Sequence, residues 1–372
     1  MRSVGVEEEL LLVDRESGEP QALSGAVLAM ADRDDEGEGA AGDTTTGSFE
    51  AELHREQLEF NTRPHRSTAE LSEEIVRRRT AAAEHADRVG AAAVALATSP
   101  LPVNPTVGTG PRYRWLTDEY GITTQEQLTC GCHVHVSVDS DEEGVAVLNR
   151  IRPWLSVLTA LSANSPFWQG KDSGYSSYRS RVWGRWPSAG PVELFADAAD
   201  YHEQIRAMVA SGVLRDPGMV YFDARLSADH PTVEVRVADV CLEPSTTVLH
   251  AMLVRGLVET AARAWRAGEP APPHPVTLLR LATWRAGRSG LDGELVSPLD
   301  MRPVPAAQAA RSLLEHVRPA LDDAGDFDEA RERLTRLLRE GNGAVVQRAV
   351  MRRTGSLRDV VADCVRRTHG GL

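Results

Sequence analysis

Gly5-Val6-Glu7-Glu8-Glu9-Leu10-Leu11-Leu12-Val13 decides the fold, because three consecutive carboxylates interrupt a run of strand-forming residues. Alternate residues of a strand share a face, so Glu7 and Glu9 project together while their immediate neighbours face the other way. Leu11 and Val13 continue the acidic face as an apolar stripe, which places both carboxylates at the edge of a core. Two such carboxylates repel each other and lose hydration unless a cation lies between them. They therefore either fray into water or form half of a metal site.

The composition indicates an ordinary globular protein. The chain has 372 residues, of which 42% are hydrophobic and 26% charged, and its formal net charge is −13. This charge argues against a broad nucleic-acid surface or an anionic membrane as partner, although a local group of cations suffices to hold a nucleotide. No apolar stretch reaches the roughly 20 residues that span a bilayer. Four cysteines do not make a disulfide scaffold. We expect a cytoplasmic protein.

The order of periodic segments favours an α+β fold over a doubly wound sheet. Helical spacing predicts helices over residues 25–31, 69–97, 145–163, 197–211 and 245–267, and strand-like text occupies residues 48–62, 128–140, 220–226 and 232–240. Prolines after residue 99 are expected to end the second helix. Residues 32–46 read as an acidic loop, residues 164–190 as a polar and aromatic loop, and residues 270–275 as a linker to a mainly helical C-terminal part. We expect one catalytic domain over 1–372. No G-x-G-x-x-G or Walker loop is present, so a nucleotide would be held differently.

A second strand repeats the division into a polar and an apolar face. His133, His135 and Ser137 share one face, and Cys130 and Cys132 lie on the opposite one. A Cys₂His₂ zinc site is therefore disfavoured, because an extended strand sends thiols and imidazoles to opposite sides. The histidines either have a structural role or form part of a functional face.

Two neighbouring strands add alternating carboxylates and guanidiniums. Glu234 and Arg236 share a face, and Asp223 and Arg225 repeat the pattern on the preceding strand. Arginine suits bidentate contact with phosphate or carboxylate. The alternatives are an exposed cross-strand ion pair for Glu234 and Arg236, and a buried structural pair for Asp223 and Arg225.

Residues 50–62 supply further polar groups, since Gln57, Glu59 and Asn61 would share one face of a strand. Several carboxylates that converge on one sheet face need divalent cations, and oxygen-rich ligation suits Mg²⁺ or Mn²⁺ better than zinc. Such a cluster beside arginines is what phosphoryl transfer from ATP requires. The residues proposed to converge are Glu7, Glu9, Glu52, Glu59, His133 and Glu234.

The loop over residues 165–181 combines glycines, aromatic residues and cations, which are typical of a substrate-binding or closing loop. An ordinary structured surface loop is the alternative.

These stretches together resemble the type 2 glutamate–cysteine ligases, also called carboxylate–amine ligases. The resemblance rests on an ordered set that runs to about residue 290: Gly5 to Leu10, Glu52 with Leu58-Glu59-Phe60, Gly131 to Val136, Asn164-Ser165-Pro166, Gly174-Tyr175 to Tyr178-Arg179, Thr232 to Arg236, and Trp284 to Gly293. It implies a glutamine synthetase-like catalytic fold, in which a curved antiparallel sheet forms a funnel for ATP, divalent metal and amino acid.

The resemblance also implies residue roles. The six converging residues would face the metals. Arg236 and Arg179 would be catalytic. Arg225, Arg236 and Arg288 would approach the nucleotide. Tyr175, Arg179, His135 and Asn61 would bind substrate.

The predicted function is an ATP-dependent ligase that forms an amide through an acyl phosphate, with glutamate and cysteine as default substrates and Mg²⁺ or Mn²⁺ as cofactor. The same chemistry on another acid and amine, a metal-dependent amide hydrolase, and a non-catalytic relative that binds nucleotide or amino acid are the alternatives. The expected partners are small molecules, with neither nucleic acid nor membrane, and a homodimer is the expectation at family level.

Overall fold

The computed structural model describes residues 1–37 and 49–369. Its centre is an antiparallel sheet with strand order β2-β3-β1-β5-β9-β8, and β4 also pairs with β1. The strands are β1 (Val4–Asp14), β2 (Phe49–Ala51), β3 (Gln57–Asn61), β4 (Ala91–Val94), β5 (Gly131–Ser137), β8 (Ala224–Leu226) and β9 (Thr232–Asp239). The expected α+β class with an antiparallel sheet is confirmed.

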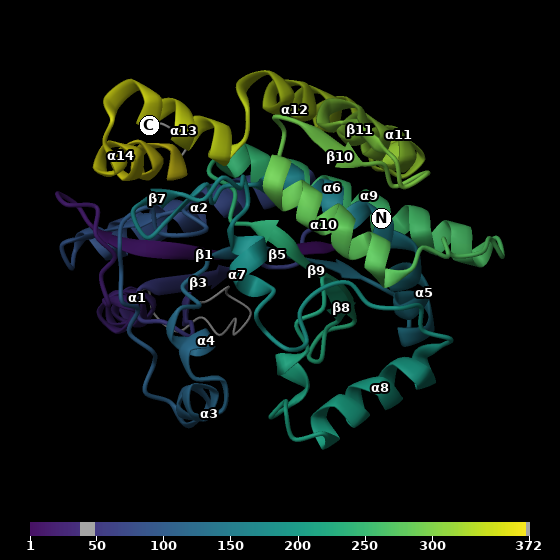
Figure 1. The fold of residues 1–372 in the computed structure, drawn as a ribbon, viewed down its shortest axis with the longest axis horizontal. Helices are drawn as coiled ribbons and strands as arrows, with labels where there is room; N and C mark the ends of the chain where they lie inside the picture. The colour runs from purple at the N-terminus through teal and green to yellow at the C-terminus, as the bar shows by residue number, and fades with distance from the viewer. Residues whose placement is uncertain (38–48, 370–372) are drawn as a thin grey trace.

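Helices surround this sheet. They are α1 (Ser24–Gly37), α2 (Thr68–Asp87), α3 (Pro111–Tyr120), α4 (Ile122–Gln125), α5 (Asp141–Ile151), α6 (Leu155–Ser162), α7 (Arg179–Trp183), α8 (Ala198–Ala210), α9 (Pro244–Arg266), α10 (Val276–Ser289), α11 (Ala306–Ala324), α12 (Phe327–Glu340), α13 (Gly343–Thr354) and α14 (Leu357–Thr368). Figure 1 shows α6, α9 and α11 on one side of the sheet and α3, α4 and α8 on the other. No helix of the described ranges is long and apolar enough to cross a membrane.

The strand register follows from which face is buried. Val6, Leu10 and Leu12 of β1 are fully buried in the apolar cores. Glu7 lies opposite Asn61 on one side and His133 on the other, and Glu9 lies opposite Glu59. A one-residue slip would move every one of these side chains to the other face, so the buried apolar residues fix the register of the acidic ones.

The predicted helix over residues 69–97 is wrong in its last third. Helix α2 ends at Asp87, and Gly90 turns the chain with a φ of +79°. The next residues form β4, which pairs with β1 between Leu11 and Asp14. Alanine favours helices in isolation, but pairing with a buried strand overrides that preference. The prolines after residue 99 therefore do not end the helix.

Other boundaries shift more modestly. The helix predicted over residues 25–31 extends to Gly37, into the expected acidic loop, whose remaining residues lie outside the described ranges. The strand-like run 48–62 divides into β2 and β3, and the helix over residues 145–163 divides at the 3₁₀ turn Arg152–Trp154.

The loop over residues 164–190 contains the small hairpin β6 (Phe167–Trp168) and β7 (Lys171–Asp172) as well as α7. After residue 275 the chain is mainly helical, as expected, with a hairpin of β10 (Glu294–Val296) and β11 (Pro303–Pro305). The single-domain organisation stays a prediction.

Candidate active site

Six acidic and histidine side chains lie together in two groups on one face of the sheet. Glu7, His133 and Glu234 form the first, which we call the histidine cluster, and in it one ligand atom from each residue lies within 4.8 Å of the others. Glu9, Glu52 and Glu59 form the second, the carboxylate cluster, by the same criterion. Strands β1, β5 and β9 supply the first cluster, whereas β1, β3 and the turn after β2 supply the second. All six residues expected to converge are thus adjacent, in two sets of three.

Glu7 of the histidine cluster contacts two imidazoles, that of His133 within the cluster and that of His135 beside it. Glu7 Oε2 lies 3.0 Å from His133 Nδ1, and Glu7 Oε1 lies 2.9 Å from His135 Nε2. Burial opposes ionisation of Glu7, but the two imidazoles outweigh it and hold the pKa of Glu7 well below its usual range. His133 Nε2 is buried and has no hydrogen-bond partner among the described residues. This nitrogen is the obvious free ligand atom of the cluster.

Two arginines neutralise the third member of the histidine cluster. Arg225 Nε donates to Glu234 Oε2 at 2.7 Å, and Arg236 donates to Glu234 Oε1. Burial opposes the charge on Glu234, but Arg236 and then Arg225 outweigh it and lower its pKa to about 2. Glu234 is therefore ionised at neutral pH. The guanidinium of Arg236 also lies 5.6 Å from the centre of the Trp183 ring.

The carboxylate cluster has no such neutralisation. Glu9 Oε2 accepts from the backbone N–H of Gly131 at 2.8 Å and from Gln57 Nε2 at 3.4 Å. Within residues 1–37 and 49–369, no arginine or histidine forms an ion pair with the three carboxylates. Burial and the neighbouring charge of Glu52 raise the pKa of Glu9 to about 7 and raise that of Glu59 well above its usual range. Such mutual repulsion is what a bound cation would relieve.

A cavity of about 280 Å³ opens over the two clusters. Trp183, Trp186 and Tyr221 form one wall, and Arg225 and Arg236 reach into it. Two polar atoms on this wall had no signal in the sequence: the Oε1 of Gln127 and the Nε1 of Trp186 are buried without a partner in the described chain. An isolated glutamine or tryptophan has no motif, so only the fold reveals them.

Two arms meet across the mouth of this cavity. Arg112 at the start of α3 forms an ion pair with Asp216, and Arg215 Nη1 donates to the Pro111 carbonyl at 3.1 Å. The hydroxyl of Tyr120 donates to the Val213 carbonyl at 2.5 Å. These contacts join α3 to the segment that follows α8, beside the cavity that Arg112 helps to line.

Arg179 lies beneath the cavity, with a relative exposure of 1%. Its Nε and Nη2 atoms have no hydrogen-bond partner in the described chain, and Nη2 would lie only 2.2 Å from a Cβ on Gly131, so a side chain at that position would displace the guanidinium. Asp239 anchors the loop that carries Arg179, because it accepts from Asn164 N at 2.8 Å, Ser165 Oγ at 2.7 Å and Ser177 Oγ at 2.8 Å. Arg179 does not line the cavity, but its guanidinium lies 5.3 Å from the centre of the Trp183 ring that does, and its charge acts on Glu9. Its catalytic role stays a prediction.

Two of the predicted binding residues lie elsewhere. Arg288 donates to the carbonyl of Gly174, and its guanidinium lies 5.7 Å from the centre of the Tyr175 ring, beside a separate hollow of about 410 Å³. The backbone oxygen of Gly287 accepts from Ser176 and Ser177 at 2.9 Å each. The Arg/Gly segment of α10 thus packs against the loop that carries Arg179. The nucleotide role of Arg288 and the substrate role of Tyr175 stay predictions.

The remaining predicted residues divide between the clusters and their surroundings. His135 joins Glu7 to Thr232, whose hydroxyl lies 3.0 Å from His135 Nδ1. Asn61, opposite Glu7, donates to Glu50 at 3.2 Å. Of the two interpretations of Asp223 and Arg225, the structure does not show the buried structural pair, because Arg225 binds Glu234 across the strands. Burial raises the pKa of Asp223 to about 7.

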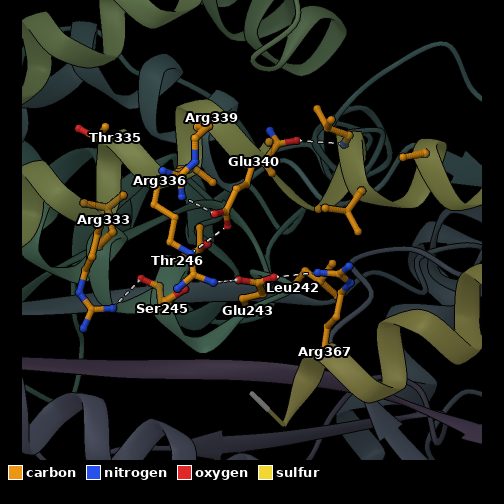
Figure 2. Close-up of a pocket in the computed structure, with 18 of the residues that line it drawn as sticks. Leu242, Glu243, Ser245, Thr246, Arg333, Thr335, Arg336, Arg339, Glu340 and Arg367 are labelled. Carbon is orange, nitrogen blue, oxygen red and sulfur yellow. Dashed lines mark hydrogen bonds and ion pairs between the residues drawn. The ribbon is translucent and has the colours of Figure 1, made fainter. Parts of the chain in front are cut away.

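A cavity of about 920 Å³, larger than the one over the clusters, lies between α9 and the C-terminal helices (Figure 2). Arginines line it, and carboxylates already bind several of them: Arg336 Nε to Glu340 at 2.9 Å and Arg367 Nη1 to Glu243 at 3.1 Å. Arg333 is likewise bound to Glu329, at 2.6 Å. Size alone therefore does not identify the functional site.

Comparison with known proteins agrees with the family resemblance found in the sequence. The model of glutamate–cysteine ligase family 2 matches residues 3–363. A relative from Streptomyces avermitilis, whose name provisionally assigns it as glutamate–cysteine ligase 2-1, is 62% identical over 370 residues, with 100% of both chains covered. Another, from Streptomyces coelicolor, provisionally named glutamate–cysteine ligase 2, is 60% identical over 368 residues and 99% of each chain.

Among solved structures, the glutamate–cysteine ligase of Francisella tularensis in complex with AMP superimposes with a TM-score of 0.68. The match covers 99% of this chain and 88% of that chain at 15% sequence identity. At this identity the likeness concerns the fold, and it confirms the glutamine synthetase-like architecture expected from the sequence.

Proposed function

This chain belongs to glutamate–cysteine ligase family 2, a family of ATP-dependent carboxylate–amine ligases, and on that basis we propose that it joins the γ-carboxyl of glutamate to the amine of cysteine. The observation that carries this proposal is the pair of acidic clusters beside Arg225 and Arg236 on one face of the sheet. ATP-dependent ligation needs positive charge near the phosphates. This face of the sheet carries two guanidinium groups, and it also carries the carboxylates and the imidazole that could bind metal ions.

The two clusters fit divalent cations. The histidine cluster offers the unpartnered Nε2 of His133 with two ionised carboxylates, and the carboxylate cluster offers three oxygen donors that repel one another. Oxygen ligands with one imidazole favour Mg²⁺ or Mn²⁺. When bound, such ions would neutralise phosphate oxygens during transfer.

The chain's own residues would carry the remaining work. A substrate carboxylate oxygen attacks the γ-phosphorus of ATP and ADP leaves, which gives an acyl phosphate. The amine then attacks the acyl carbon, phosphate leaves, and the amine loses a proton as the amide forms. Arg236 would stabilise charge on the transferred phosphoryl group, because its guanidinium reaches the cavity and its Nε has no partner in the described chain. The arms joined by Arg112 and Asp216 would exclude water, which otherwise hydrolyses the acyl phosphate.

The amine would bind against the wall of Trp186 and Gln127. The buried Oε1 of Gln127 can accept a hydrogen bond from the amine, and the Nε1 of Trp186 can donate one to an oxygen of the same substrate. Leaving both atoms without a partner is unfavourable, so a substrate that satisfies them gains affinity.

A phosphate-release screen tests the proposal. Purified protein is incubated with Mg-ATP and a matrix of amino acids and amines, and the peptide product is identified by mass spectrometry. We expect release that depends on both glutamate and cysteine, and its loss in Glu7→Gln and Glu234→Gln. The matched control is Glu294→Gln on the exposed face of β10, which should retain the wild-type rate. Full activity in both cluster variants would contradict the assignment.

A metal-dependent hydrolase is the second candidate, and the unpartnered His133 Nε2 is the observation that favours it. A bound metal would then activate water against an amide. Calorimetric titration separates the two candidates, because a ligase binds Mg-ATP whereas a hydrolase acts without it. Binding of nucleotide without turnover on any pair would instead indicate a non-catalytic relative. The proposed homodimer is tested by sedimentation.

A further inference from the structure

The middle carboxylate of the triplet, Glu8, points away from the clusters. It lies between Glu7 and Glu9 on β1, so its side chain projects from the opposite face of the sheet. Its relative exposure is 0%, and the residues around it come from α2, α9 and the end of α14. The three successive glutamates therefore lie in three different environments: Glu7 in the histidine cluster, Glu9 in the carboxylate cluster, and Glu8 in the protein interior on the opposite face of the sheet.

Arg79 of α2 binds Glu8 in a bidentate arrangement. Nε donates to Glu8 Oε2 at 2.8 Å, and Nη2 donates to Oε1 at 2.7 Å. The other guanidinium hydrogens reach three backbone carbonyls: Cys241 at 2.7 Å, Leu242 at 3.0 Å and Thr368 at 3.2 Å. Arg79 itself has a relative exposure of 0%, so every hydrogen bond of this group is made inside the protein.

Thr247 of α9 completes the arrangement. Its hydroxyl donates to Glu8 Oε1 at 2.6 Å and lies 3.3 Å from Arg79 Nη2. Burying an ion pair is costly, and apolar residues of similar volume often stabilise a core at least as well. A bidentate pair tied to three carbonyls does, however, fix orientation, because its donors and acceptors are strongly directional.

We propose that Arg79 and Thr247 are positioning residues for the metal ligands of the active site. By fixing Glu8 from behind, they set the position of the β1 backbone, and hence the distance of Glu7 and Glu9 from their cluster partners. The inference rests on the proposed metal-binding role of the two clusters. It adds two residues that touch neither substrate nor metal, and it explains why a third carboxylate stands between two ligands.

Manganese binding to the metal-free, full-length protein tests the inference, measured by calorimetry at a temperature where each variant is folded. Outer-shell partners of metal ligands contribute roughly 10- to 100-fold to metal affinity. We expect a loss in that range for Arg79→Lys, because an ammonium group cannot reproduce the bidentate contact. Thr247→Val, which is nearly isosteric, should lose less. The matched control is Thr159→Val, a buried helical threonine whose hydroxyl bonds only to the Leu155 carbonyl of its own helix, at 3.1 Å.

Ligase kinetics give a second readout. The metal concentration at half-maximal rate should rise in Arg79→Lys and Thr247→Val, while kcat at saturating metal changes little. A role in folding alone would lower the melting temperature and leave metal affinity at its wild-type value, and that result in either variant would overturn the inference. If Arg79→Lys does not fold, the metal affinity of Thr247→Val, compared with that of its control Thr159→Val, decides whether the inference holds. Normal metal binding without ligase activity would instead overturn only the proposed function, whereas absence of metal binding in the wild type would overturn both.

Discussion

The two clusters of the active site differ in how the protein treats their charge. In the histidine cluster, Glu7 and Glu234 are bound by His133, His135, Arg225 and Arg236, so both carboxylates are ionised and satisfied before any ligand arrives. In the carboxylate cluster, the charges of Glu9, Glu52 and Glu59 face one another without a basic partner in the described chain. One cluster is preorganised, and the other is completed only by what binds to it.

This difference predicts opposite responses to the same chemical change. Removing charge from the histidine cluster leaves buried cations unpaired, which destabilises the fold. Removing charge from the carboxylate cluster relieves repulsion, which stabilises the fold while it removes a metal ligand. The clusters should therefore be separable by stability measurements, even though loss of either abolishes the ligase reaction.

The largest expected effect concerns Arg236, which binds Glu234 of the histidine cluster and which we propose also stabilises the transferred phosphoryl group. Arg236→Lys retains a charge but loses the planar fork, so we expect kcat to fall by about 10³-fold. Initial rates of ADP release at saturating substrates measure this. Arg318→Lys, on an exposed surface of α11, is the control. A decrease below tenfold would show that Arg236 only neutralises Glu234.

Glu234→Gln should destabilise the metal-free protein by about 3 kcal/mol, because Arg225 and Arg236 lose their buried anionic partner. Urea denaturation followed by tryptophan fluorescence measures the change. An unchanged midpoint would mean that solvent or a neighbouring carboxylate replaces Glu234, and the contrast between the two clusters would then fail.

The carboxylate cluster should make stability depend on pH in the metal-free protein. Burial and then Glu52 raise the pKa of Glu9 to about 7, above the value of about 4.5 in the unfolded chain. The folded state therefore holds this proton more tightly, and its stabilisation is complete below pH 4.5 and lost as the pH rises through 7. The loss amounts to at most about 3 kcal/mol. Denaturation at pH 4.5 and pH 8 measures it, and saturating Mg²⁺ should reverse the trend because the cation competes with the proton.

Glu59→Gln should give the smallest change, and one of opposite sign. We expect the metal-free protein to gain about 1 kcal/mol at alkaline pH, since the amide stays neutral whereas ionisation of Glu59 is opposed by burial and by the charge of Glu52. Ligase activity should be lost in the same variant. A decrease in stability would indicate that Glu59 makes a favourable contact that outweighs the repulsion.

Alternation along strands predicts five of the six cluster residues, because a strand sends every second side chain to the same face. Glu52 lies in the turn after β2, where alternation says nothing, and it rests on the family resemblance. The division of the six residues into two clusters was not predictable, since it depends on the pairing of Glu7 with His133 and of Glu9 with Glu59. Register is set by the buried residues of neighbouring strands, which are distant in the sequence.

Other parts of the site were outside the reach of pattern alone. Arg288 belongs to a recognisable motif, but motif order does not reveal on which side of α7 a helix lies, and the structure places it beside Tyr175. Gln127 and Trp186 carry no motif at all. The strand β4 was taken for helix because its alanines are informative only once β1 lies beside them.

The Arg79 contacts also have a consequence for the order of events during synthesis. They join residue 8 to the carbonyl of Thr368, which is 289 residues beyond Arg79 in the chain. Contacts so distant in sequence form late in folding. The first strand leaves the ribosome with its acids already in place, but its fixed spacing waits until translation has passed residue 368. A nascent chain would therefore carry the proposed ligands before this last contact of Arg79 is available, and we expect the geometry of the proposed metal site to be complete only after it forms.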